Sequence, residues 1–163
     1  MATRDEIIAA IRQGEERVAR TFGGLTDAQL ATRVHEGEGG WTAKEVLAHL
    51  AGRQQGYDRT YQLAESGPPP PGSMAGFSVD DWNRQRIAER SGKSRDDLLA
   101  EFRQVHDALI ARVRETPDDL LQRPIPRAQG PVPFGDALAG GGGRHALNHS
   151  AEVERALGLP EPS

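Results

Sequence analysis

The sequence predicts an all-α fold: a four-helix bundle with a long crossover between its second and third helices and one short extra helix. Three observations carry this prediction. Helix-start signals recur along the chain, apolar residues repeat every three or four positions after each signal, and two segments rich in proline and glycine interrupt the pattern. The sequence shows no internal repeat, no coiled-coil heptad and no β-hairpin signature.

Three hydroxyl residues each stand three positions before an acid, so that side chain and backbone can satisfy each other's free amides at a helix start. The pairs are Thr3 with Glu6, Thr42 with Glu45, and Ser94 with Asp97. They predict helices over residues 4–22, 43–64 and 95–115. Each helix carries an apolar stripe, made of Ile7, Ile11, Val18 and Phe22 in the first, Val46, Leu50, Tyr57 and Tyr61 in the second, and Leu98, Phe102, Val105, Leu109 and Val113 in the third.

The two proline- and glycine-rich segments set the topology. Residues 66–76 are too many for a tight hairpin, so the second and third helices are expected to be joined by a crossover, with a short helix over 79–90 after Ser78. Residues 123–133 separate the third helix from a last helical segment that ends near Leu157. Four glycines at 140–143 interrupt that segment. Either the helix starts only at Arg144, or the glycines let another backbone or a ligand approach closely.

Composition bounds the class of protein. The 163 residues fit a single domain spanning 1–163, and the absence of cysteine excludes a disulfide framework, a thiolate metal site and a cysteine nucleophile. The acidic start and the lack of a long apolar run predict a cytoplasmic protein without a membrane partner. The net charge of -4, from 20 basic and 24 acidic side chains, predicts no nucleic-acid partner, and a small-molecule substrate is the expected partner.

Three histidines form a candidate site for one divalent metal ion. His145 and His149 are four residues apart on the last helix and therefore share a face. His49 lies at the margin of the apolar stripe of the second helix, pointing toward the bundle interior. Three imidazoles from two facing helices would leave open positions for water or substrate. Such a site accepts zinc, nickel, iron or copper. The alternative is that these are solvated histidines or histidines at the edge of the core.

Three further titratable residues could lie near this candidate site. Glu152 shares the face of His145 and His149, and it either orients an imidazole or is a solvated acid. His106 lies near the core face of the third helix, and it either lines the pocket or is a satisfied histidine at the core edge. His35 lies in a glycine-rich loop and is expected to be exposed.

Three stretches of the chain resemble the DinB-like superfamily. Residues 40–50, with Trp41 before a capped helix and His49-Leu50 at its end, are similar to the start of that superfamily's second helix. Residues 143–153 are similar to its last helix with an H-x-x-x-H pattern. Asp81-Trp82-Asn83 and the stretch 94–102 resemble the middle region of its ClbS/DfsB and mycothiol-dependent maleylpyruvate isomerase branches. The likeness covers nearly the whole chain.

The resemblance implies an up-down-down-up bundle that forms a homodimer and binds a metal through His49, His145 and His149. Known members include thiol-dependent isomerases and transferases, and the ClbS/DfsB branch includes self-protection proteins against reactive natural products. The chain departs from the ClbS/DfsB pattern at Gly141 and Gly142, where those sequences tend to carry a polar pair such as Asn-Thr.

Three functional hypotheses remain open, and no catalytic residue is assigned. The first is a metal-dependent transferase or isomerase (Zn, Ni or Fe) that detoxifies electrophiles with a low-molecular-weight thiol, since the chain has no cysteine of its own. Arg53 and Tyr57 would then bind carboxylates or the leaving group, although Arg53 also suits a surface position with its stem packed on the bundle.

The second hypothesis is a hydrolase or a sequestering self-resistance protein, with a pocket around Trp82, Asn83 and Tyr57. Trp82 is alternatively a core anchor for the short helix. The third hypothesis is a non-enzymatic dimeric bundle whose histidines bind adventitious metal or none.

Overall fold

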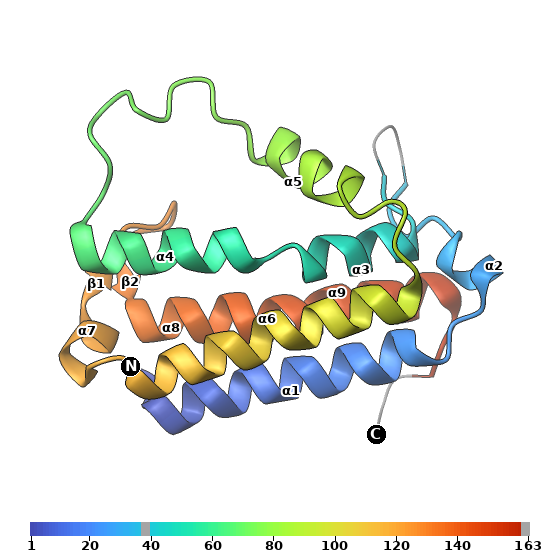
Figure 1. Cartoon of the computed structure of the whole chain (residues 1–163), viewed down its shortest axis with the longest axis horizontal. Helices are drawn as coiled ribbons and strands as arrows, with labels where there is room; N and C mark the ends of the chain where they lie inside the picture. Colours follow the sequence, from blue (N-terminus) through green and yellow to red (C-terminus); the bar gives the residue numbers. More distant parts are fainter. Residues whose placement is uncertain (37–39, 161–163) are drawn as a thin grey trace.

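Four helical columns lie side by side in the computed structural model, which describes residues 1–36 and 40–160. The columns are α1 (Arg4–Gly23), α3 (Ala43–Ala51) with α4 (Gln54–Ser66), α6 (Arg95–Glu115), and α8 (Phe134–Ala139) continued through the π-helix η1 (Gly140–Arg144) into α9 (His145–Leu157). Figure 1 shows that α1 and the α8–α9 column run in one direction, whereas α3–α4 and α6 run in the other. The predicted four-helix bundle is therefore confirmed, with up-down-down-up order.

The helix starts follow the sequence signals. Thr3, Thr42 and Ser94 each accept a hydrogen bond from the backbone amide three residues on, and the acid at that position bonds back, so α1, α3 and α6 begin with complete capping boxes. Each such cap contributes about 1 kcal/mol to helix stability. The predicted bounds of the first and third helices agree with α1 and α6 to within one residue.

The second column is broken, contrary to the predicted continuous helix over 43–64. Helix α3 ends at Ala51, and α4 begins at Gln54. A Cβ at Gly52 would lie 3.2 Å from Arg90 Nη1 and 3.3 Å from Arg86 Cβ, so the end of the crossover packs closely against this point. The break places Arg53 at the N-cap of α4.

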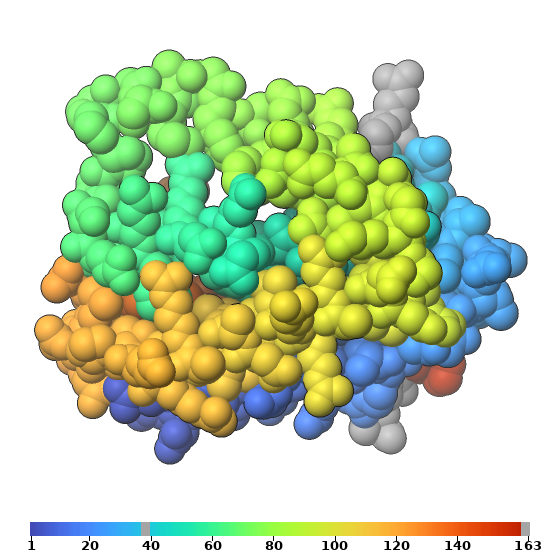
Figure 2. Space-filling model, viewed as in Figure 1, coloured from blue at the N-terminus to red at the C-terminus, as the bar shows by residue number. Residues whose placement is uncertain are grey.

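The crossover consists of residues 67–78 followed by α5 (Val79–Ala88). Figure 1 shows it running back along the length of the bundle, outside α4 and α3. The space-filling view shows an opening between this arch and α4 (Figure 2). The predicted short helix is present and ends two residues before the expected Arg90.

Three small elements complete the described part of the chain. They are α2 (Asp27–Leu30), α7 (Asp118–Gln122) and an antiparallel pair of strands, β1 (Pro124–Ile125) and β2 (Val132–Pro133). Pro124 pairs with Pro133, and Ile125 pairs with Val132. This short hairpin was not predicted, because two-residue strands are too short for the alternation that identifies a strand.

The core lies between the columns, and the apolar stripes face it. Ile7, Ile11, Val18 and Phe22 of α1 are completely buried. None of the helices in the described ranges combines the length and apolar character needed to cross a membrane.

The glycine run at 140–143 is helical, which resolves the open question of the sequence. It forms the wide turn of η1 and lies directly against α1. A Cβ at Gly142 would lie 2.8 Å from Ile11 Cγ1, and a Cβ at Gly143 would overlap the carbonyl of Ala10. On the α1 side, a Cβ at Gly14 would lie 2.9 Å from the Gly142 oxygen. The absence of side chains here lets the two backbones approach closely.

Candidate metal centre

Three histidines from two columns meet inside the bundle. His49 lies on α3, and His145 and His149 lie on α9. One ring nitrogen from each lies within 4.8 Å of the others, and the Nε2 atoms of His49 and His145 are 2.9 Å apart. The ring centroids are 5.0 Å apart for His49 and His145 and 4.5 Å apart for His145 and His149. The structure thus brings the three predicted ligands to one point.

The local structure explains why these rings face each other. His145 and His149 are one turn apart on α9 and therefore share the face that packs against α3. The π-helical turn of η1 ends immediately before His145, so its extra residue sets the register of α9 relative to α8. Single π-turns inside helices are frequent at functional sites.

Burial keeps two of the three histidines neutral. Burial, followed by the nearby His149 and Arg53, lowers the pKa of His49 to about 3. Burial, followed by the positive charge of Arg53 and the other histidines, lowers the pKa of His145 to about 2. Unprotonated imidazoles are the form that binds a metal ion. At neutral pH the two rings are therefore uncharged and do not repel a cation.

Glu152 is hydrogen-bonded to the third histidine. Its Oε2 accepts a hydrogen bond from Nδ1 of His149 at 2.8 Å, which leaves Nε2 of that ring free. Burial raises the pKa of Glu152, but hydrogen bonds from His149 and His35 outweigh it and lower the pKa overall. Glu152 is thus hydrogen-bonded to two histidines and partly buried, an arrangement compatible with the orienting interpretation.

The expectation that His35 is simply exposed is wrong. Its ring is partly buried, and its Nε2 lies 3.1 Å from Oε2 of Glu152. Trp41 lies beside it, with ring centroids 5.8 Å apart, and the indole also packs 4.8 Å from the ring of His49. Sequence reasoning missed these contacts of His35 because they arise only when residues 33–35 pair with Trp41 and Thr42. Trp41 could have been found from its place directly before the capped helix that carries His49.

Arg53 lies close to the three histidines, and Tyr57 lies next to Arg53. The guanidinium carbon of Arg53 is 5.4 Å from the centre of the Tyr57 ring, and its Nε is buried with no hydrogen-bond partner in the described ranges. Its charge lowers the pKa values of both His49 and His145, so the guanidinium is close to the histidine cluster. A cation in this position can bind an anionic group of a ligand.

The hydroxyl of Tyr57 joins a buried hydrogen-bond network. It lies 3.0 Å from Nε2 of His106 and 3.1 Å from the carbonyl oxygen of Gly141. Nδ1 of His106 donates to the Phe102 carbonyl at 2.9 Å, and burial lowers the pKa of His106 to about 4. His106 is 1% exposed. Of the two alternatives, His106 is therefore the core histidine whose ring nitrogens both have hydrogen-bond partners.

Trp82 and Asn83 are not brought to the histidines. Both lie on α5, on the outer side of the bundle. The Trp82 ring contacts Phe77 and the guanidinium of Arg86, and it lines a hollow of about 450 Å³ beneath the crossover. Asn83 is partly buried next to it. Tyr57 faces the interior, so these three residues do not form one pocket.

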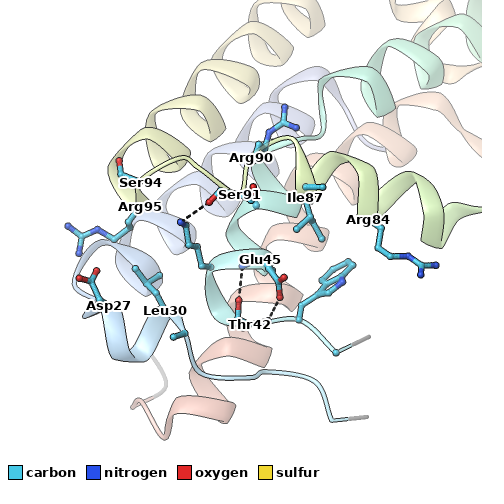
Figure 3. A pocket seen from close by; sticks show the side chains of 16 residues that line it. Asp27, Leu30, Thr42, Glu45, Arg84, Ile87, Arg90, Ser91, Ser94 and Arg95 are labelled. Atoms are coloured by element: carbon cyan, nitrogen blue, oxygen red, sulfur yellow. Dashed lines mark hydrogen bonds between the residues drawn. The ribbon is translucent and has the colours of Figure 1, made fainter. Parts of the chain in front are cut away.

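A larger hollow of about 910 Å³ lies between α2, the start of α3, α5 and the start of α6. Figure 3 shows Leu30 and Ile87 lining it, while Glu45 is engaged in the cap of α3 at Thr42. Trp41 borders this hollow and also packs on His49. The histidines themselves do not line it.

Solved structures with the same fold carry several activities. YfiT from Bacillus subtilis, described as a probable metal-dependent hydrolase with an unusual four-helix bundle topology, is 19% identical, with a TM-score of 0.65 over 96% of this chain and 89% of YfiT. The mycothiol-dependent maleylpyruvate isomerase is 22% identical, with a TM-score of 0.70 over 93% of this chain but only 61% of the isomerase. The colibactin self-resistance protein ClbS, in complex with double-stranded DNA, is 13% identical, with a TM-score of 0.75 over 99% of both chains.

The ClbS complex corrects one expectation. The exclusion of a nucleic-acid partner from the net charge of -4 is wrong, because a protein of this fold is in complex with DNA. Net charge sums over the whole surface, whereas DNA meets only one face, so a slightly acidic protein can still present a basic patch.

The sequence itself matches the model of a defined family. A search of individual curated proteins, by contrast, finds no match. Residues 11–140 match the mycothiol maleylpyruvate isomerase N-terminal domain family, a stretch that includes His49 and ends before His145 and His149. The family match and the structural neighbours agree on the superfamily predicted from the three sequence stretches. The chain belongs to the mycothiol maleylpyruvate isomerase N-terminal domain family of the DinB-like superfamily.

Proposed function

We propose that the chain is a metal-dependent enzyme that acts on small electrophilic molecules with the help of a low-molecular-weight thiol. One divalent ion would be held by His49, His145 and His149. The observation that carries the proposal is the convergence of three imidazole nitrogens within 4.8 Å from two separate columns. Zinc, nickel and iron all suit such a donor set.

The residues present fit a metal ion. Low pKa values keep His49 and His145 unprotonated, and Glu152 fixes the ring nitrogen that His149 presents. Three protein ligands leave coordination positions open, as in catalytic sites. A bound divalent ion would polarise a substrate oxygen or favour the deprotonated form of a thiol or water.

The chain's own residues would bind and orient the substrate. Arg53 places its guanidinium, whose Nε has no hydrogen-bond partner in the described ranges, next to the histidines, where it can hold a carboxylate or another anionic group. Tyr57 is fixed by His106 and Gly141 and forms a rigid wall on the same side. Because the chain has no cysteine, a thiol must come from a small molecule.

Thiol dependence tests the proposal. We would load the purified chain with zinc, nickel or iron and follow turnover of a panel of electrophiles, including unsaturated carboxylic acids, with and without mycothiol or glutathione. We expect turnover only when both the metal and the thiol are present. The substitution His49→Ala should abolish this turnover. Absence of thiol-dependent turnover across the panel would contradict it. Asn148→Ala is the matched control, since Asn148 is exposed between His145 and His149.

A metal-dependent hydrolase is the second candidate. Its support is the likeness to YfiT, described as a probable metal-dependent hydrolase, together with the open positions that a three-histidine site leaves for water. The same assay separates the two candidates. Metal-dependent turnover of ester or amide substrates without added thiol would favour the hydrolase.

A further inference from the structure

One carboxylate oxygen joins two imidazoles at the edge of the metal centre. Oε2 of Glu152 lies 2.8 Å from Nδ1 of His149 and 3.1 Å from Nε2 of His35. A carboxylate only accepts hydrogen bonds, so both rings must donate to it. A neutral His149 that donates from Nδ1 keeps the lone pair of Nε2 free for a metal ion.

His35 is also connected to a second ligand. Its ring packs edge-on against Trp41, with centroids 5.8 Å apart. The indole of Trp41 packs against His49 at 4.8 Å and lies 6.3 Å from His149. His35 thus touches two residues, Glu152 and Trp41, that each contact a candidate ligand.

The backbone holds His35 at this place. The amide of Val34 donates to the carbonyl of Trp41 at 2.8 Å, and Arg33 pairs with Thr42 in an isolated antiparallel bridge. Thr42 is the N-cap of α3, the helix that carries His49. The segment that carries His35 is therefore tied to the same rigid element as the first ligand.

Glu152 needs such a second donor. Its side chain is 34% exposed, so with His149 alone it could turn toward solvent and lose its fixed orientation. A hydrogen bond from a ring on the other side restricts the carboxylate to one position. Partners that orient metal ligands typically change metal affinity by about 10–100-fold when they are removed.

We propose that His35 is a positioning residue of the metal centre, which holds Glu152 so that His149 presents Nε2 to the ion. The effect of His35 on metal binding rests on the proposed function, because both concern the same histidine site. Its structural part, the tautomer of His149, does not require a bound metal.

The experiment compares the wild-type chain with His35→Ala, His35→Gln and Glu36→Ala. Gln retains a side-chain donor, and Glu36 is an exposed neighbour that serves as the matched control. We would measure the zinc dissociation constant by competition with a chelating dye. On the metal-free proteins, nitrogen NMR of the histidine rings would report the tautomer of His149, and thermal unfolding would report the fold.

His35→Ala is expected to weaken zinc binding about tenfold, at the low end of the range for orienting partners. The Nδ1–H tautomer of His149 should become less populated in the same variant. His35→Gln should recover part of the affinity, and Glu36→Ala should match the wild type. The proposal is overturned if His35→Ala binds zinc as tightly as the wild type with an unchanged His149 spectrum, or if Glu36→Ala loses as much affinity. If the wild-type chain binds neither zinc nor, in the same competition assay, nickel or iron, the proposed function fails, and the His149 tautomer in the metal-free variants still decides the role of His35.

Discussion

The Nε2 atoms of His49 and His145 lie 2.9 Å apart, although the two residues are separated by 96 positions in the chain. A neutral imidazole carries one N–H and one lone pair, so in the metal-free chain the Nε2–H of one ring can donate to Nε2 of the other at this distance. Burial lowers the pKa of both rings and so disfavours a positive charge on the pair at neutral pH. A divalent ion that replaced the shared proton would meet two uncharged imidazoles beside His149.

Replacing His145 with alanine should remove metal binding. The variant loses one of three ligands, so its zinc affinity should fall by more than the 10–100-fold that is typical of orienting partners. Metal content after purification without an affinity column, measured by mass spectrometry, checks this. Asn148→Ala, on the exposed side of the same helix, should retain the wild-type content. Equal metal content in His145→Ala would contradict the candidate site.

Acid should destabilise the metal-free chain. Burial lowers the pKa of His49 to about 3 and that of His106 to about 4, below the usual histidine value of about 6.5. Between these values the unfolded chain binds more protons than the folded chain, so the free energy of unfolding falls as the pH decreases from about 6.5 toward 4. Each buried histidine should cost about 1–2 kcal/mol by pH 5. Urea unfolding at pH 7 and pH 5 measures the difference.

Removing the hydroxyl of Tyr57 should cost more stability than removing that of Tyr61. Tyr57→Phe leaves Nε2 of His106 without its donor in a buried place, a loss of about 1–3 kcal/mol. Tyr61 bonds to Oγ1 of Thr116, which keeps its own hydrogen bond to the Arg112 carbonyl at 2.7 Å. Chemical unfolding of the two variants compares them directly. A larger loss for Tyr61→Phe would show that the network around His106 is not the stabilising one.

Local features of the chain were predictable because short-range physics decides them. The pairing of Thr3 with Glu6 fixed the start of α1, and the four-residue spacing of His145 and His149 required only that the segment be helical. The position of His49 at the edge of an apolar stripe was enough to predict that it faces the interior.

Features that depend on distant contacts were not predictable. His35 reaches Glu152 across 117 positions, and nothing in its glycine-rich neighbourhood indicates that the chain folds back there. At Gly52, where the second column is broken, Arg86 and Arg90 approach from a distant part of the chain. Sequence periodicity describes one element at a time, so it misses effects that arise between elements.

Two glycines of η1 provide the sharpest test of the bundle itself. A Cβ at Gly143 would overlap the Ala10 carbonyl of α1, and backbone cannot move aside as a flexible side chain can. Gly143→Ala should therefore destabilise the chain by about 2–3 kcal/mol, the upper part of the range for overpacking. Gly140 is only three residues earlier, yet a Cβ there would meet nothing within 4 Å, and its backbone angles, φ -64° and ψ -49°, are helical.

Gly140→Ala should consequently be neutral or stabilise the chain by up to about 1 kcal/mol, since alanine favours the helix over glycine. Thermal unfolding followed by circular dichroism measures both variants on the same scale. Equal effects of the two substitutions would mean that α1 and η1 do not pack backbone to backbone. A loss confined to Gly143→Ala would show that the close contact with Ala10 is what requires glycine at this point.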